Sequence, residues 1–197
     1  MTVTYELLGN VPTTNITSAV LGESSIVTTI NKVVEQSSTT LRYKIGDTVL
    51  QQKDIGTAAS DTYVIPASAG QYFPTQKTAT LTIEAETFVG GESYGVVTTS
   101  VTLTLPDEAK PTATCALKRT WVTGVSSEAQ INAYVQTKSG VSFALTGTAN
   151  YGATVSTFTV SIEGKSYTRT GNGSIAHSPL SGSGTIAYTY SVTDSRG

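Results

Sequence analysis

Apolar and polar residues alternate with a period of two along much of the chain. Apolar side chains recur at nearly every second position in segments 3–7, 41–45, 79–85 and 97–105 of the first half, and 141–145, 158–162 and 186–192 of the second. Successive side chains of a β-strand point to opposite faces, so this period predicts strands with one buried and one exposed face. The last of these strands is expected over 184–194, with Ile186, Tyr188, Tyr190 and Val192 toward the core.

Short glycine-containing segments separate the predicted strands. Gly46-Asp47 predicts a two-residue type II′ hairpin turn, because glycine at the first turn position readily takes a positive φ. The segment "VGGESYG" predicts a hairpin between the strands at 79–85 and 97–105, and Glu163-Gly164 predicts a tight turn after 158–162. The segment "PASAGQYFP" at 66–74 has no clean period and predicts a crossover loop with about one helical turn.

A boundary between two domains is expected at "PDEAKP", residues 106–111. This segment combines two prolines with three charges, in a chain where only 13% of residues are charged. The 197 residues suffice for two modules of about 100 residues, each with its own core. We therefore predict an all-β protein of two tandem immunoglobulin- or fibronectin-III-like β-sandwich domains, spanning 1–106 and 112–197, with a linker at 107–111.

Charge and cysteine content exclude several classes of partner and fold. The net charge of −2 provides no basic surface for phosphates, so we expect no nucleic-acid partner. The single cysteine, Cys115, cannot form an internal disulfide. The N-terminal "MTVTYELLG" has no signal-peptide pattern and no apolar run is long enough to cross a bilayer, so we expect synthesis in the cytoplasm and no membrane insertion.

Several motifs of the chain occur in a distinctive order. The second half contains "VQ-x-K-S", "YGAT" and "VTDSRG", at Gln136, Lys138, Ser139, Tyr151, Gly152, Ala153, Thr154, Asp194, Ser195, Arg196 and Gly197. The first half contains "IPASAGQYFPTQKTATLTIEAETFVGGESYG". These motifs and their order resemble those of a known family, the minor structural, tail-associated proteins of siphophages with immunoglobulin-like modules. The chain departs from this pattern at Thr137, where the family more often has glycine.

The resemblance implies a virion protein at the tail or tail tip that spaces or presents a host-attachment element. Its expected partners are other tail proteins within a larger or homo-oligomeric assembly, with a host cell-surface glycan as a further partner. It implies no catalytic residues and no cofactor. The alternative is a bacterial surface adhesin or carbohydrate-binding module, which would require export signals in the neighbouring coding sequence.

The resemblance also implies that "VTDSRG" closes a penultimate strand. A further strand after Gly197 would then pair along Tyr188 to Val192, so we expect the second module to lack its last strand within this sequence. The edge of the strand at 184–194 would be exposed to water, or paired with a neighbouring chain or with another segment such as "TATCALK".

Aromatic residues on or beside loops are the candidate binding residues. Trp121, Tyr72, Tyr94 and Tyr151 could offer flat faces to sugar rings or anchor a protein interface, although packing between strands and loops would also account for them. We favour Trp121 among these.

No catalytic or metal site is expected elsewhere. His177 is the only histidine, and we expect it in a loop with no neighbouring carboxylate. Glu84 and Glu86 lie two apart on one strand face, as paired carboxylates of solvated strands often do. Asp194-Ser195-Arg196 is expected to form a turn rather than an adhesive tripeptide. We therefore predict a protein that is not an enzyme.

Overall fold

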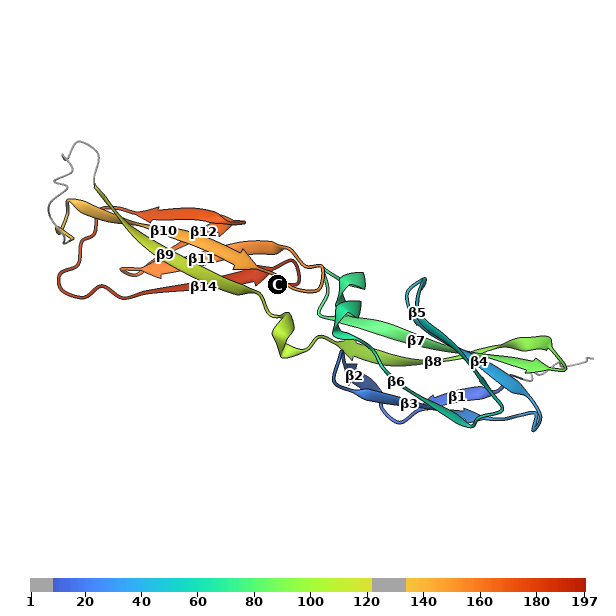
Figure 1. The fold of residues 1–197 in the computed structure, drawn as a ribbon. Helices are drawn as coiled ribbons and strands as arrows, with labels where there is room; N and C mark the ends of the chain where they lie inside the picture. The colour runs from blue at the N-terminus through green and yellow to red at the C-terminus, as the bar shows by residue number, and fades with distance from the viewer. Residues whose placement is uncertain (1–8, 122–133) are drawn as a thin grey trace, which may run out of the picture. The chain divides into compact units, whose positions relative to one another are not determined.

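A computed structural model describes residues 9–121 and 134–197, and it confirms the prediction of an all-β protein (Figure 1). The chain divides into two compact units, unit 1 (Met1–Asp107) and unit 2 (Glu108–Gly197), within the segment 106–111. The strand predicted at 3–7 lies outside the described residues. The helical elements among the described residues are two short 3₁₀ segments, η1 (Ala67–Tyr72) and η2 (Asp107–Ala109).

Unit 1 is a sandwich of two sheets. One sheet has the order β1-β3-β6, with strands Val11–Thr14, Ser25–Asn31 and Ser60–Val64. The other has the order β2-β8-β7-β4-β5, with strands Ser18–Val20, Glu92–Thr104, Thr78–Val89, Ser38–Ile45 and Thr48–Gly56. All neighbouring strands are antiparallel except β2 and β8, which are parallel.

The core of unit 1 consists of the residues that the period of two predicts to be buried. From the larger sheet, the chief contributors are the alternate residues of β4 and β7, Leu41, Tyr43, Ile45, Leu81, Ile83 and Ala85. Ile26 and Ile30 of β3 contribute from the smaller sheet. The positions between them on β4 carry Thr, Arg and Lys, so the alternation places hydrophobic residues between the sheets and polar ones toward solvent.

The turns follow the predicted chemistry. Gly46, between β4 and β5, has a φ of 55°. Gly90 and Gly91 both have positive φ values, 60° and 89°, in the two-residue turn between β7 and β8. Positive φ at both central positions is the type I′ pattern, whose twist matches that of the flanking strands. The segment 66–74 contains η1, in agreement with the predicted helical turn.

Unit 2 is also a sandwich, and its described residues form two three-stranded sheets. One has the order β13-β10-β9, with strands Gly173–His177, Ser139–Thr148 and Thr112–Trp121. The other has the order β12-β11-β14, with strands Lys165–Thr170, Val155–Ile162 and Tyr188–Asp194. Between them lie the predicted core residues Val141, Phe143, Leu145, Phe158, Val160 and Ile162, joined by Ile175 and Leu180.

The two units share one order for six strands. The sheet β1-β3-β6 of unit 1 corresponds to β9-β10-β13 of unit 2, and β5-β4-β7 corresponds to β12-β11-β14. Among the described residues, unit 1 contains two more strands, β8 along β7 and β2 along β8. This order is compatible with an immunoglobulin-like sandwich, and that finer assignment stays a prediction.

The last strand of unit 2 differs from the expectation. β14 begins at Tyr188 rather than at residue 184, so Ile186 precedes the strand. Tyr190, expected in the core, is 41% exposed. The reason is its place at the edge of a sheet: β14 pairs with β11 on one side, and the described residues put no strand along the other. Among the described strands, the outer flank of the Tyr190 ring is therefore uncovered.

A buried asparagine links three segments of unit 1. The side-chain amide of Asn10 donates hydrogen bonds to Ser37 Oγ at 2.8 Å and Thr39 Oγ1 at 3.0 Å, and its Oδ1 accepts one from the Val33 backbone N–H at 3.0 Å. The Asn10 backbone N–H donates to Thr87 Oγ1 at 2.7 Å. Buried polar groups need such partners, because an unsatisfied one retains its desolvation penalty. Asn10 thus fixes the chain before β1 against β4 and β7.

Replacing Asn10 with alanine should destabilise unit 1 by about 3 kcal/mol, because the change leaves buried hydrogen-bonding groups without partners. Asn15→Ala is the matched control: Asn15 is exposed and accepts one bond, from Val27 N–H at 2.8 Å. Since water can replace that bond, its loss should cost about 1 kcal/mol or less. Urea unfolding followed through the amide NMR signals of β4 and β7 measures both. Equal losses would contradict the structural role of Asn10.

Candidate functional site

An apolar groove opens between the two sheets of unit 2. It has a volume of about 260 Å³ and is lined by Leu117, Tyr134, Val141, Phe143, Ile162, Leu180, Gly184, Ile186 and Tyr188. β9 and β10 supply one wall, the ends of β11 and β14 the other, and the segment before β14 closes the groove at one side. Apart from the glycine, every lining side chain is aliphatic or aromatic, which favours binding of apolar groups over ions.

Residues at the rim of the groove expose large apolar surfaces. Leu117 is 46% exposed and Tyr134 is 50% exposed. The Tyr188 ring lies inside against Phe143, with ring centroids 5.1 Å apart. Contiguous apolar surface of this kind marks a place where a partner excludes water. The groove is therefore the candidate interaction site of unit 2.

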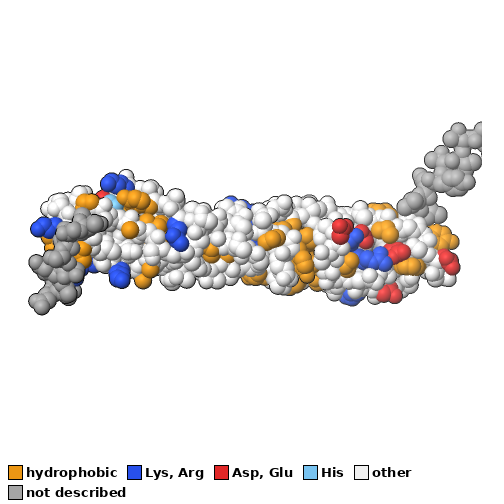
Figure 2. All heavy atoms as spheres, turned by 90° about the horizontal axis from the view of Figure 1, so that it is seen from above, with side chains coloured by type: hydrophobic (Ala, Val, Ile, Leu, Met, Phe, Trp, Pro, Cys, Tyr) orange, Lys and Arg blue, Asp and Glu red, His pale blue; other side chains and the backbone are white. Residues whose placement is uncertain are grey.

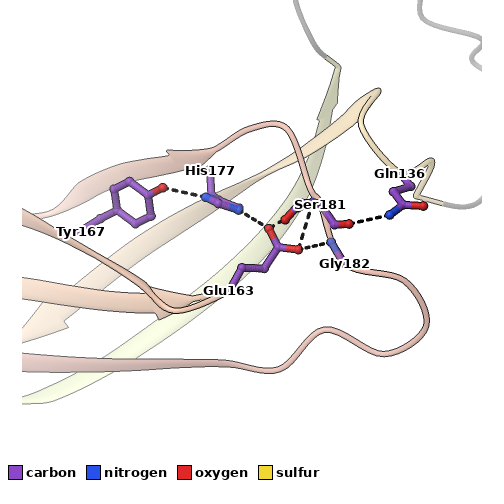
Figure 3. Close-up of polar contacts among 6 residues, drawn as sticks. All are labelled: Gln136, Glu163, Tyr167, His177, Ser181 and Gly182. Carbon is purple, nitrogen blue, oxygen red and sulfur yellow. Dashed lines mark hydrogen bonds and ion pairs between the residues drawn. The ribbon is translucent and has the colours of Figure 1, made fainter.

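A carboxylate and a histidine fix the segment that borders the groove (Figure 3). Glu163, in the turn between β11 and β12, accepts a hydrogen bond from the Ser181 backbone N–H at 3.0 Å and another from that of Gly182. Its other oxygen, Oε2, lies 2.7 Å from His177 Nε2, and His177 Nδ1 lies 2.7 Å from the hydroxyl of Tyr167. We call Glu163, His177, Tyr167, Ser181 and Gly182 the Glu163 network.

The position of His177 corrects the sequence-based expectation. His177 is not a loop residue but the last residue of β13, and it is only 2% exposed. It also has a neighbouring carboxylate, because the β11–β12 turn brings Glu163 to it across 14 residues of sequence. The hydrogen bond from His177, followed by that from Gly182 N–H, lowers the pKa of Glu163 to about 2.

A turn before β10 completes the border of the groove. The Gln136 side-chain amide donates to the Ser181 carbonyl at 2.6 Å, and Thr137 N–H donates to the Leu180 carbonyl at 2.8 Å. Thr137 has a φ of 62°, a left-handed conformation that β-branched residues rarely adopt. Thr137, where the family more often has glycine, thus has a backbone conformation that favours glycine.

The four predicted aromatic residues lie on four different elements or turns. Tyr72 ends η1 and is 46% exposed, and Tyr94 lies in β8 and is 47% exposed. Trp121 lies at the end of β9 rather than in an irregular segment, and Arg119 Cζ is 5.3 Å from its ring centroid. Tyr151 occupies a turn with a φ of 51°, where its carbonyl accepts a bond from Arg196 Nη2 at 2.7 Å. Sequence reasoning missed the groove, whose lining residues come from segments far apart in the chain.

The carboxylates of Glu84 and Glu86 are both paired with cations on β4. Glu84 Oε1 lies 2.8 Å from Lys44 Nζ, and Glu86 Oε2 lies 2.7 Å from Arg42 Nη2. The hydrogen bond from Arg42, followed by that from Ser93, lowers the pKa of Glu86. Figure 2 shows acidic and basic side chains next to each other on one face of unit 1. These pairs are cross-strand contacts of the kind that stabilise sheets.

The segment Asp194-Ser195-Arg196 forms a turn, as its residues predict. Asp194 Oδ1 accepts a bond from Arg196 N–H at 2.9 Å, and Gly197 N–H donates to the Asp194 carbonyl at 3.1 Å. The Arg196 guanidinium also donates to the Asn150 carbonyl at 3.1 Å. These contacts anchor the end of β14 to the loop between β10 and β11.

Replacing Glu163 with glutamine should lower the stability of unit 2 and remove part of its dependence on pH. The folded state holds the pKa of Glu163 at about 2, against 4.5 for an ordinary glutamate. Its charge therefore contributes full stability above about pH 4.5, and the contribution is lost as the pH falls toward 2. Trp121 is the only tryptophan, so fluorescence-detected unfolding reports on unit 2.

Glu108→Gln, at an exposed position, is the matched control and should leave the slope of stability against pH between 4.5 and 2 unchanged. If Glu163→Gln kept the wild-type slope in this range, Glu163 would not be the titrating group.

In residues 9–121 and 134–197, no three His, Cys, Asp or Glu side chains gather as a metal site would require. No helix in these residues is long and apolar enough to cross a membrane.

Comparison with known proteins shows which family the chain resembles. No curated protein matches the chain. A family model described as "Siphovirus protein of unknown function (DUF859)" matches residues 3–197, which confirms the resemblance to a siphophage family. Because the match covers almost the entire sequence, the chain belongs to this family of siphovirus proteins.

Proposed function

We propose that the protein is a structural module of the siphovirus tail or tail tip, where it spaces or presents a host-attachment element. The observation that carries the proposal is the succession of two β-sandwich units, each with its own hydrophobic core, in a chain of a siphovirus family. A unit with a separate core keeps its fold when its neighbours change, so such units extend an appendage by repetition.

The surface chemistry supports a role in assembly. Many exposed strand positions are threonine or serine, for example Thr78 and Thr80 of β7 and Thr98, Ser100 and Thr102 of β8. The groove of unit 2 adds a defined apolar contact surface. Other virion proteins are therefore the proposed partners, within a larger or homo-oligomeric assembly. A siphovirus protein is favoured over a bacterial surface adhesin or carbohydrate-binding module, because the matching family is one of siphovirus proteins.

Contact with a host cell-surface glycan is a further part of the proposal. Tyr72 and Tyr94 are the most suitable residues, because nearly half of each side chain is exposed and a phenol ring combines an apolar face with a hydrogen-bonding hydroxyl. Trp121 is less suitable than its sequence position suggested, because Arg119 lies over its ring.

Antibodies against the purified chain should label the tails of intact virions of the encoding phage in immunogold electron microscopy. Mass spectrometry of gradient-purified virions should detect its peptides alongside those of tail proteins. Antibody pre-absorbed with the purified chain serves as the labelling control. Label confined to capsids, or a protein abundant in the lysate but missing from purified virions, would refute the proposed location.

A further inference from the structure

Two sequence motifs, "YGAT" at 151–154 and "VTDSRG" at 192–197, meet in the fold of unit 2. Ser195 N–H donates to the Thr154 carbonyl at 2.9 Å, and Thr154 N–H donates to Ser195 Oγ at 3.2 Å. These bonds join the turn after β14 to the residue before β11, across 41 residues of sequence. The two motifs therefore form one structure rather than two separate turns.

Arg196 lies at the centre of this structure, and its side chain is only 4% exposed. Its guanidinium donates to the carbonyls of Asn150 at 3.1 Å and Tyr151 at 2.7 Å, and Nη1 lies 3.2 Å from Asp194 Oδ2. Because Tyr151 has a φ of 51°, these bonds hold a turn that a residue other than glycine rarely adopts. We call Arg196, Asp194, Asn150 and Tyr151 the Arg196 clamp.

The side chain of Asn150 connects the Arg196 clamp to the domain boundary. Its Nδ2 donates to the Glu108 carbonyl at 2.8 Å, and Glu108 is the first residue of unit 2. Farther along the chain, Thr112 begins β9 and pairs with Thr148 of β10. The segment 108–112 is thus attached to unit 2 at both of its ends.

This double attachment changes the role of the linker predicted at 107–111. A connector lets two units reorient only where its backbone is bound to neither of them. Ala109, which lies between the two attachments, is 5% exposed, so the segment also packs against its surroundings. Most of the predicted linker therefore belongs to unit 2.

We propose that the Arg196 clamp is a positioning device for the joint between the two units. Through Asn150 it binds the segment 108–111 to unit 2, and it thereby shortens the part of the chain that acts as a hinge. Loss of the Asn150 contact would extend the free connector through these residues. This inference uses the division of the chain into two units and does not depend on where the protein stands in the virion.

Asn150→Ala tests the connection alone, because it removes the bond to Glu108 but keeps the backbone carbonyl that Arg196 binds. In amide NMR relaxation of the 197-residue protein, the order parameters at 108–110 should fall from about 0.85 to below about 0.6. Asn172→Ala is the matched control: Asn172 also makes one side-chain bond to the backbone of unit 2, from Gly147 N–H at 2.9 Å. It should leave the amides at 108–110 unchanged.

Arg196→Lys tests whether the clamp acts through Asn150. Lysine keeps the positive charge beside Asp194, but its single ammonium group cannot reproduce the planar fork that binds two carbonyls. The order parameters should fall at 151–152 and also at 108–110, while slow hydrogen exchange of the β11 amides shows that the sandwich is still folded. In the double variant with Asn150→Ala, the amides at 108–110 should be no more mobile than with Asn150→Ala alone, since the same connection is already cut.

Four results would overturn the proposal. Two concern the connection itself: low order parameters at 108–110 already in the unchanged protein, or wild-type values there in Asn150→Ala. The third is an equal loss in Asn172→Ala, which would show a general loosening of unit 2. The fourth is an Arg196→Lys variant that is mobile at 151–152 but not at 108–110. If Arg196→Lys unfolds unit 2, the comparison of Asn150→Ala with Asn172→Ala still decides.

Discussion

Hydrogen bonding along strand edges is the constraint on which the rest of this structure depends. Small sheets have a high proportion of edge strands, and each edge must be paired, shortened or charged. Unit 1 meets this requirement on its larger sheet by adding β8 and β2 beyond β7. In unit 2, the described strands pair β14 with β11 on one side. The groove of unit 2 is lined in part by Tyr188, the first residue of β14.

Multiple hydrogen bonds to single polar side chains then decide how the connecting segments lie on this framework. Asn10 joins the segment before β1 to β4 and β7, and Glu163 joins the β11–β12 turn to the segment after β13. Each side chain satisfies several backbone or hydroxyl groups at once. Removing either one therefore affects more than a single contact. In unit 2 this arrangement positions part of the groove's lining, because Leu180 directly precedes Ser181, the residue that Glu163 and Gln136 both contact.

Much of the fold could be predicted from local sequence, and the site could not. Alternation identified strands such as Leu41–Ile45 and Phe158–Ile162, because period two and burial on one face are properties of adjacent residues. Glu163-Gly164 was recognisable as a turn for the same reason, with φ values of 48° and 72°. The meeting of Glu163 with His177 has no local signal, since it depends on how β13 lies beside β12. Tyr190 misled the prediction because alternation shows which face a residue takes, not whether a neighbouring strand covers it.

The one parallel pair among the described strands has a mechanical consequence. β2 lies near the start of unit 1 and β8 near its end, and they run side by side in register from Ser18↔Thr102 to Val20↔Thr104. The contacts Thr102 N–H to the Thr17 carbonyl and Leu21 N–H to the Thr104 carbonyl extend this pairing. A force that pulls the two ends of the unit apart acts along both strands in opposite directions, so it loads these hydrogen bonds together in shear. Hydrogen bonds loaded in shear share the force, so the β2–β8 pairing would resist such a pull better than a strand pair that unzips one bond at a time.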